Sequence, residues 1–336
     1  MKLTFNQIQA IATGAMLCRE NEDGTAFLRR VTESQHAVYP AGCCNYFLYA
    51  RAAGITLDFY TDAEEITLTI NGSATSQQTR MVVDLLEDGT ISGSHTSVFG
   101  KGAGDDEQTF QNLRFAFFLK KGEKRVTVYF DNYRTINGLC VELTDGASVR
   151  PYIHKRTIIA FGDSITQGSS PRFPSNSYMH RLCRMLDARV YNFGVNGERF
   201  RKENIVPGTY PQCDFVTIAL GTNDFGHTDS TEAGFMNNMP EFLRKAAAEF
   251  PDVPIFVLLP LWRHNEDVPG NIGTLQSVRD RIAAEAKKYS NMTVIDCKSF
   301  IPAEPKYFAD LVLHPNDEGA AKYADALAKA IVEEIG

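Results

Sequence analysis

A serine stands where a predicted strand turns into a predicted helix. Ser164 follows the apolar run 157–161 within the tripeptide Gly162-Asp163-Ser164. A serine at such a sharp turn presents its hydroxyl at the sheet edge, and the amides after it point their hydrogens toward whatever the hydroxyl attacks. Ser164 is therefore a candidate nucleophile. Two other interpretations remain open on these residues alone: Ser164 caps a helix, or the glycine-rich turn holds a phosphate.

Uncharged hydrogen-bond donors follow the next two predicted strands. Gly197 closes the segment 192–197, and Asn223 lies in Gly-Thr-Asn-Asp, residues 221–224. A glycine N–H and an asparagine amide are donors that oxyanion holes often use. Near the chain end, His314 precedes a proline and the last predicted helix. A histidine there can reach the same rim as a general base, because its pKa lies near neutrality.

A parallel sheet would bring these residues together, since ligands bind beyond the carboxyl ends of parallel strands. From residue 157 the sequence alternates apolar strands with amphipathic helices, which predicts such a sheet with helical crossovers. The expected strands are 157–161, 189–193, 215–220, 255–259 and 292–296. The expected helices are 177–188, 231–250, 275–290 and 317–335.

The first part of the chain has short alternating stretches instead, which predict an all-β sandwich. The expected strands are 46–50, 55–60, 65–70, 81–86, 113–119, 125–130 and 138–143, with a hairpin of 16–20 and 26–31 before them. Turns are expected at 71–73, 87–89 and 121–123, and a long loop at 99–109. The 336 residues are therefore divided into two domains, 1–150 and 151–336.

The four candidate residues carry a family resemblance. The sequence resembles the SGNH, or GDSL, hydrolase family of esterases and lipases, whose four ordered blocks here hold Ser164, Gly197, Asn223 and His314, over roughly residues 157–336. The resemblance implies a three-layer α/β/α fold related to flavodoxin and serine-dependent hydrolysis of carboxylic esters. It implies that Ser164 attacks the ester and that His314 removes its proton. The N–H groups of Ser164 and Gly197 and the side chain of Asn223 would hold the oxyanion.

One departure concerns the third member of a triad. The family usually has an aspartate three residues before its histidine, whereas Asp310 stands four before His314. We expect the loop to bulge so that Asp310 still orients the imidazole. The alternative is a Ser-His dyad in which a backbone carbonyl orients the ring.

Other polar residues near the rim have weaker claims. His227, four residues after Asn223, could face the rim, although a histidine in a polar loop is more often simply solvated. Asp163 and Asp224 are expected to fix their loops by hydrogen bonds rather than to act as acids. No cluster has metal-ligand spacing, so neither a metal nor another cofactor is implied.

Trp262, the only tryptophan, follows the fourth strand with Arg263 behind it, and both are candidate substrate-binding residues. The indole could form a wall for a sugar or an acyl chain, or it could simply pack against a helix. The order of the two parts resembles family-two carbohydrate esterases, in which a jelly-roll-like sandwich precedes the SGNH domain. That resemblance implies removal of acetyl groups from saccharides, and the absence of a long apolar lid favours a short acyl group.

Composition excludes several classes of protein. With 43% hydrophobic and 22% charged residues the chain is neither disordered nor fibrous. A net charge of −7 disfavours nucleic acid as a partner, and no run of about 20 apolar residues could span a membrane. No signal peptide is recognised, and seven cysteines without paired spacing favour a reducing, cytoplasmic location.

Three functional hypotheses follow from the sequence. The first is an esterase that deacetylates a carbohydrate or a similar small polar ester. The second is a lipid-type acyl hydrolase or thioesterase, whose activity would rise with acyl chain length. The third is a glycan-binding protein with an inert site, which the complete set of four motif residues disfavours.

Overall fold

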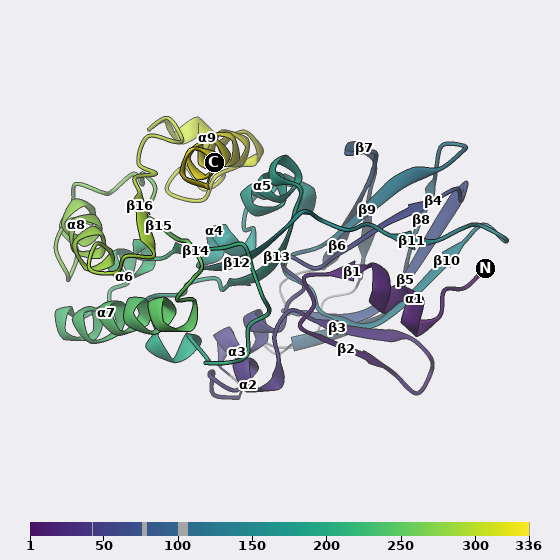
Figure 1. The fold of residues 1–336 in the computed structure, drawn as a ribbon, viewed down its shortest axis with the longest axis horizontal. Coiled ribbons are helices and arrows are strands. Elements are labelled where there is room, and N and C mark those ends of the chain that lie inside the picture. The colour runs from purple at the N-terminus through teal and green to yellow at the C-terminus, as the bar shows by residue number, and fades with distance from the viewer. Residues whose placement is uncertain (42, 76–78, 100–106, 336) are drawn as a thin grey trace. The chain divides into compact units, whose positions relative to one another are not determined.

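The computed structural model describes residues 1–41, 43–75, 79–99 and 107–335, and the chain divides into two compact units (Figure 1). Unit 1 consists of Met1–Thr32, Tyr46–His154 and Phe173–Ser175, and unit 2 of Glu33–Asn45, Lys155–Arg172 and Asn176–Gly336. Residues 33–45, from the first half of the chain, thus belong to the second unit. The domain division at residue 150 stays a prediction.

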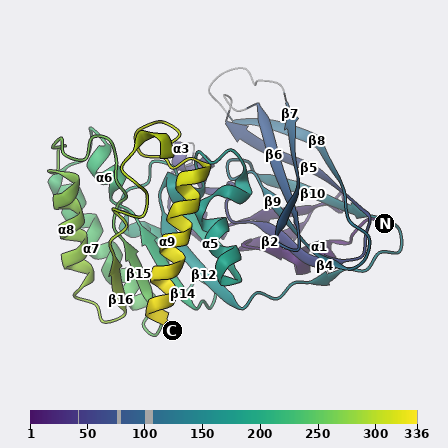
Figure 2. The ribbon, with the colours of Figure 1, turned by 90° about the horizontal axis from the view of Figure 1, so that it is seen from above.

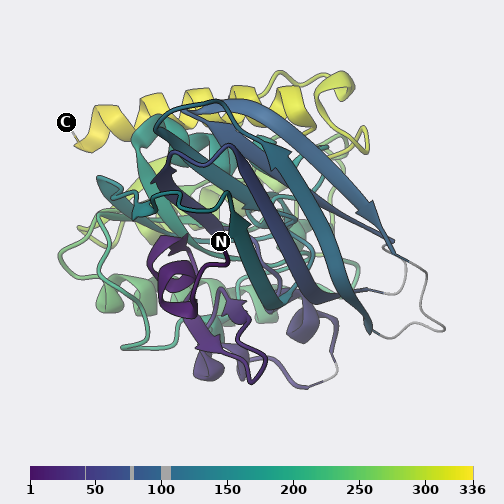
Figure 3. The same cartoon turned by 90° about the vertical axis from the view of Figure 1, so that its right-hand side faces the viewer.

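Unit 1 is a sandwich of two antiparallel sheets, shown from the side of the N-terminus in Figure 3. One sheet has the order β2-β3-β10-β5-β8, and these strands are Leu17–Glu20, Ala26–Arg29, Ile136–Leu143, Glu65–Thr75 and Glu107–Phe118. The other has the order β1-β4-β9-β6-β7, with β11 paired to β4. Its strands are Ala12–Thr13, Thr56–Thr61, Lys124–Phe130, Arg80–Glu87, Thr90–Val98 and Arg150–Pro151.

The inner faces of the two sheets form one apolar core. Val126, Val128 and Phe130 alternate along β9 and pack in the same cluster as Leu68 and Phe115 of the other sheet. Successive side chains of a strand point to opposite faces, so these three share the inner face. Thr127 and Tyr129, on the other face of β9, are buried as well. The all-β prediction for this part of the chain is therefore confirmed.

Three details of unit 1 differ from expectation. Residues 46–50 were predicted as a strand, but the structure has the helix α3 at Cys44–Tyr49. The prediction was wrong because a short apolar run does not distinguish a strand from a helix. The predicted turn at 71–73 lies inside β5, where the pairing with β8 shifts register. Strand β7 and the N-terminal helix α1, Phe5–Ile11, were not anticipated. Most of the predicted loop 99–109 lies outside the described residues.

Unit 2 contains a parallel sheet of order β13-β12-β14-β15-β16. The strands are Ala188–Gly194, Arg156–Gly162, Phe215–Ala219, Ile255–Leu258 and Met292–Ile295, and all five were predicted. In chain order the arrangement is 2-1-3-4-5, which is the flavodoxin-like order.

Helices cover both faces of this sheet (Figures 1 and 2). Helices α5, Tyr178–Leu186, and α9, Asp317–Ile335, share one apolar cluster with the strands, while α7, Glu232–Glu249, and α8, Leu275–Ala286, lie on the opposite side. The shorter elements are α2 (Glu33–His36), α4 (Ser164–Gln167), η1 (Pro174–Asn176), η2 (Lys202–Asn204), α6 (Thr222–Gly226) and η3 (Pro305–Tyr307). The predicted three-layer α/β/α fold is confirmed.

Strand order also determines where a site can form. Strand β12 lies between β13 and β14, so the loops after these three strands meet at the point where the strand order reverses. Such a switch point is where open α/β sheets bind ligands. Among the helices of the described residues, none is long and apolar enough to cross a membrane.

Candidate active site

Ser164 begins the short helix α4 directly after β12. Its Oγ lies 2.8 Å from Nε2 of His314, which is within hydrogen-bonding distance. Asp163 is the N-cap of α4, and its side chain accepts the N–H of Ile165 at 2.9 Å. The carboxylate of Asp163 therefore fixes the turn that holds the serine, as expected for a loop-fixing residue.

The sharp turn requires close packing between α4 and the end of β13. A Cβ on Gly194 would lie 2.5 Å from the backbone nitrogen of Gln167, a distance that real side chains do not tolerate. The glycine therefore lets the turn of α4 approach the neighbouring strand. The side-chain amide of Asn192 donates to the Thr166 carbonyl at 2.7 Å and ties the two segments together.

Asp310 reaches the histidine in spite of the longer spacing. Its Oδ2 lies 2.7 Å from Nδ1 of His314, while its Oδ1 accepts the N–H groups of Val312, Leu313 and His314 at 2.9, 2.9 and 3.1 Å. Leu311 takes up the extra residue with a φ of 60°, and its side chain is 60% exposed. Although partial burial alone would raise the pKa of Asp310, the hydrogen bonds from Leu313 and His314 lower it to about 2. The carboxylate is thus ionised at neutral pH.

The three predicted oxyanion donors, Ser164, Gly197 and Asn223, follow β12, β13 and β14. Gly197 has a φ of 76°, in the left-handed region that favours glycine. Among the described residues, no protein acceptor takes the backbone N–H of Ser164 or of Gly197. The side-chain amide of Asn223 donates one hydrogen to the carbonyl of Glu198 at 3.0 Å. Because an amide nitrogen carries two hydrogens, the second is left for a ligand.

Three carboxyl groups lie buried behind these loops. Burial raises the pKa of Asp163 to about 6 and that of Asp224 to about 7, although backbone N–H donors partly offset the effect. Burial also raises the pKa of Glu198. Asp224 accepts the N–H of Phe200 at 3.2 Å, so it ties the Asn223 loop to the Gly197 loop. This is the loop-fixing arrangement expected for Asp224.

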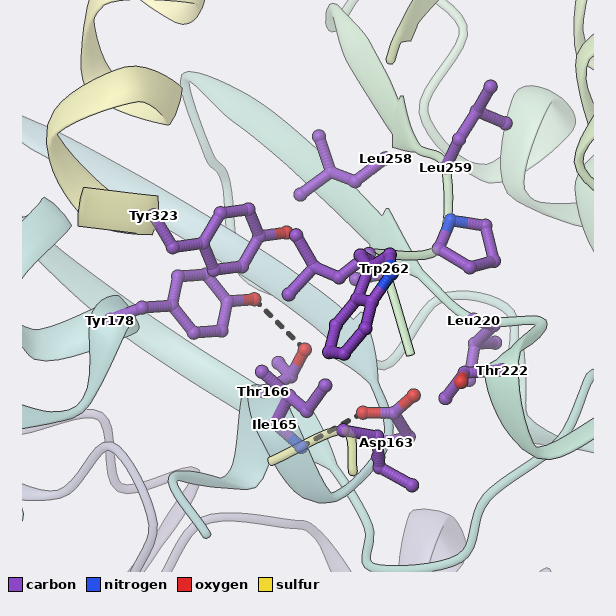
Figure 4. Close-up of a pocket in the computed structure, with 14 residues that line it drawn as sticks. Asp163, Ile165, Thr166, Tyr178, Leu220, Thr222, Leu258, Leu259, Trp262 and Tyr323 are labelled. Carbon is purple, nitrogen blue, oxygen red and sulfur yellow. Dashed lines mark hydrogen bonds between the residues drawn. The ribbon is translucent and has the colours of Figure 1, made fainter. Parts of the chain in front are cut away.

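Trp262 lines a small apolar cavity beside the serine turn (Figure 4). The cavity has a volume of about 30 Å³, and half-buried Ile165 and Leu313 line it together with Trp262. The indole also packs on Phe308, with ring centroids 5.0 Å apart. Ile165 and Leu313 are the chain neighbours of Ser164 and His314, which do not themselves line the cavity.

Arg263 lies inside the protein rather than at the cavity. Its guanidinium donates to the Thr222 carbonyl at 2.9 Å and to the Asn265 side chain at 2.7 Å, and it lies 5.1 Å from the centre of the Phe225 ring. These contacts anchor the start of α6, next to Asn223. A substrate-binding role for Arg263 stays a prediction.

A polar groove of about 890 Å³ begins at Gly197. Its lining includes Asn45, Arg199, His227 and Asp229. The Nδ1 of His227 lies 3.8 Å from the Asp229 carboxylate, and the His227 side chain is 44% exposed. His227 therefore faces this groove, and its Nε2 lies 4.0 Å from the place that a Cβ on Gly197 would take.

Sequence reasoning missed two residues at the oxyanion loop. Glu198 follows Gly197 directly, so an acid beside a glycine was the one available signal. Tyr39 donates its O–H to Glu198 across 159 sequence positions, for which the sequence offers no local signal. Within the described ranges no group of three or more His, Cys, Asp or Glu side chains could hold a metal ion.

Comparisons with known proteins give the family and the fold. A model of the GDSL-like lipase/acylhydrolase family matches residues 160–322, which include all four motif residues. No curated protein matches the chain in sequence.

Several solved structures have the same fold along the whole chain. A salicylyl-acyltransferase, SsfX3, from a tetracycline biosynthetic pathway is 18% identical with a TM-score of 0.72, covering 96% of this chain and 95% of its own. A family-two carbohydrate esterase from Cellvibrio japonicus is 16% identical with a TM-score of 0.63, covering 99% and 97%. An acetyl xylan esterase, Est2A, from the rumen bacterium Butyrivibrio proteoclasticus is 15% identical with a TM-score of 0.63, covering 100% and 98%. At these identities the likeness establishes the fold.

Proposed function

We propose that Ser164 is the nucleophile of this protein. The chain is a carboxylic ester hydrolase that belongs, through residues 160–322, to the GDSL-like lipase/acylhydrolase family. The observation that carries the proposal is the continuous path from the Ser164 hydroxyl through the His314 ring to the Asp310 carboxylate. His314 takes the serine proton on Nε2 as the hydroxyl attacks the ester carbonyl. Asp310, ionised at neutral pH, accepts a hydrogen bond from Nδ1–H and stabilises the imidazolium that forms without taking its proton.

The negative charge on the carbonyl oxygen then needs donors. The free N–H groups of Ser164 and Gly197 and the remaining amide hydrogen of Asn223 are the proposed set. A fixed donor of this kind typically contributes about 3 to 4 kcal/mol to the transition state. Protonated His314 next returns its proton to the leaving alcohol, and water attacks the acyl-enzyme by the same route in reverse.

The proposed substrate is a short acyl ester of a polar alcohol, and an acetylated carbohydrate fits best. A cavity of about 30 Å³ beside the serine turn suits a methyl group and not a long chain. The large polar groove beyond Gly197 suits an alcohol with many hydroxyl groups. The fold shared with a family-two carbohydrate esterase and an acetyl xylan esterase supports the same choice. In this proposal Trp262 forms one wall of the acyl pocket.

A substrate series tests the proposal. Nitrophenyl acetate, butyrate and octanoate would be compared with acetylated xylo-oligosaccharides, using wild type and Ser164→Ala. We expect kcat/KM to fall with chain length, acetate release from the oligosaccharide, and no turnover above background by Ser164→Ala. Equal hydrolysis by wild type and Ser164→Ala would overturn the enzymatic proposal, whereas a preference for octanoate would indicate a lipid-type acyl hydrolase.

A further inference from the structure

The segment 33–45 packs against the oxyanion loop although it precedes that loop by more than 150 residues. It lies in the chain between two strands of the sandwich, yet it belongs to the same compact unit as the parallel sheet. Gln35 donates to the Thr209 hydroxyl at 2.9 Å, and Arg201 donates to the Val38 carbonyl at 3.2 Å. The first half of the chain thus contributes an integral piece of the catalytic unit.

The centre of this contact is a buried tyrosine and a buried glutamate. The hydroxyl of Tyr39 donates to Oε2 of Glu198, and it accepts the side-chain amide of Asn204 at 2.9 Å. Asn45 lies 3.4 Å from the same glutamate oxygen, and the N–H of Arg199 donates to Oε1 at 3.2 Å. Tyr39 is 2% exposed and Glu198 is 5% exposed.

Glu198 is connected to two of the three proposed oxyanion donors. It is bonded covalently to Gly197, and its backbone carbonyl accepts the side-chain amide of Asn223 at 3.0 Å. A displacement of Glu198 therefore moves the Gly197 N–H and reorients the Asn223 amide at the same time. The carboxylate end of the same residue is the end held by Tyr39.

A buried carboxylate is costly unless hydrogen bonds satisfy it. A well-packed apolar side chain at position 198 would avoid that cost, so the carboxylate needs another reason to be here. Hydrogen bonds have strong directional preferences, whereas apolar contacts have none. An oxyanion hole needs such directional contacts, because its donors act only when their orientation is fixed beforehand.

We infer that Tyr39 and Glu198 are positioning residues that fix the Gly197 and Asn223 donors, so that the segment 33–45 completes the catalytic site. The inference rests on the proposed function. Tyr39 is not among the residues that line the polar groove, and Glu198, which lines it, has both carboxylate oxygens held by protein donors. Their removal should therefore lower the rate of acylation without weakening the binding of the ground state.

Tyr39→Phe is the principal test, because it removes one hydroxyl and keeps the ring. Its matched control is Tyr210→Phe, which removes the hydroxyl of a half-buried tyrosine in the same region. The Tyr210 hydroxyl donates to the Asn204 carbonyl at 2.8 Å and accepts the Val206 N–H at 3.0 Å, without contact to Glu198. Glu198→Gln is the second variant and leaves Gly197 unchanged.

Four quantities would be measured on the full-length chain: kcat and KM for nitrophenyl acetate, the rate constant for inactivation by an alkyl fluorophosphonate, and Tm. The phosphonyl oxygen occupies the oxyanion position, so inactivation reports on the donors directly. We expect Tyr39→Phe to lower kcat and the inactivation rate by roughly tenfold to a hundredfold, the size of effect that a small misplacement produces. KM should stay within about twofold, and Glu198→Gln should follow the same pattern.

Tyr210→Phe should lower Tm by about as much as Tyr39→Phe does, because each loses one hydroxyl. Its kcat and its inactivation rate should stay within about twofold of wild type. The inference fails if Tyr39→Phe and Glu198→Gln keep wild-type rates, or if Tyr210→Phe loses as much as they do. The two failures can be told apart with Ser164→Ala. This variant stays inactive if only the inference about Tyr39 and Glu198 fails, and it keeps activity if the proposed function fails.

Discussion

The Nδ1 atom of His314 lies 2.7 Å from Oδ2 of Asp310, although the two residues are four positions apart. The other oxygen of Asp310 accepts three consecutive backbone N–H groups, from Val312 to His314. The Asp310 carboxylate thus stabilises the loop 310–314 with one oxygen and contacts the His314 ring with the other. The additional residue is accommodated outward, as exposed Leu311.

This geometry predicts a large effect of Asp310→Asn. The asparagine would present an amide N–H to the ring and favour the tautomer in which Nε2 is protonated, so His314 could not accept the serine proton. We expect kcat on nitrophenyl acetate to fall on the order of 10²- to 10⁴-fold. Turnover equal to wild type would show that the imidazole needs no carboxylate.

The backbone at Leu311 predicts opposite outcomes for two substitutions. Leu311 has a φ of 60°, which costs an ordinary residue about 1 to 2 kcal/mol but costs glycine little. Leu311→Gly should keep wild-type kcat and should not lower the free energy of unfolding. Leu311→Pro cannot adopt this φ and also loses the N–H that donates to the Phe308 carbonyl, so kcat should fall at least tenfold. Chemical denaturation and kcat for both variants test this, and equal behaviour of the pair would argue against the bulged loop.

The buried carboxyl of Asp224 predicts a pH-dependent stability. Burial raises its pKa from an ordinary 3.8 to about 7, so between these values the folded state binds more protons than the unfolded state. The contribution of Asp224 to the free energy of unfolding should therefore fall as the pH rises from about 4 to about 8. Asp224→Asn lacks this loss, so its stability relative to wild type should increase across the window, on the order of 3 to 4 kcal/mol at most.

Urea denaturation at several pH values would measure that difference. Asp229→Asn is the control, because it makes the same exchange at a side chain that is 69% exposed. A difference for Asp224→Asn that does not change with pH would mean that Asp224 titrates normally in the folded protein.

The cavity beside Trp262 predicts a change in acyl-chain preference. Trp262→Ala would enlarge a space of about 30 Å³, whereas Trp262→Phe keeps most of its wall. We expect the ratio of kcat/KM for nitrophenyl octanoate to that for nitrophenyl acetate to rise roughly tenfold in Trp262→Ala, the worth of a few methylene contacts. Trp262→Phe should stay near wild type. If the ratio is unchanged in both variants, the indole only packs against Phe308.

The catalytic half was largely predictable because its signals are local. Ser164, Gly197 and Asn223 each follow an apolar strand, and parallel strands bring such residues to one edge. The sandwich was less predictable. Gly72 indicates a turn by composition, yet it lies within β5, where a Cβ would come 2.2 Å from the Thr135 carbonyl. A close approach between two segments of the backbone and a tight turn both require glycine, so the sequence alone does not show which of the two a glycine serves.

Contacts between distant segments set the limit of prediction. The pairing of Tyr39 with Glu198 joins a loop of the first half to a loop of the second, and neither residue belongs to a motif. The inward direction of Arg263 likewise depends on acceptors at Thr222 and Asn265, which follow from loop geometry rather than from periodicity.

Covalent labelling tests whether Ser164 is the nucleophile. The full-length protein would be treated with an alkyl fluorophosphonate, and the modified peptide identified by mass spectrometry in parallel with loss of esterase activity. We expect one adduct, on Ser164, that forms in step with inactivation, is absent in Ser164→Ala and forms much more slowly in His314→Gln. Inactivation with the adduct on another residue, or full activity with Ser164 modified, would contradict it.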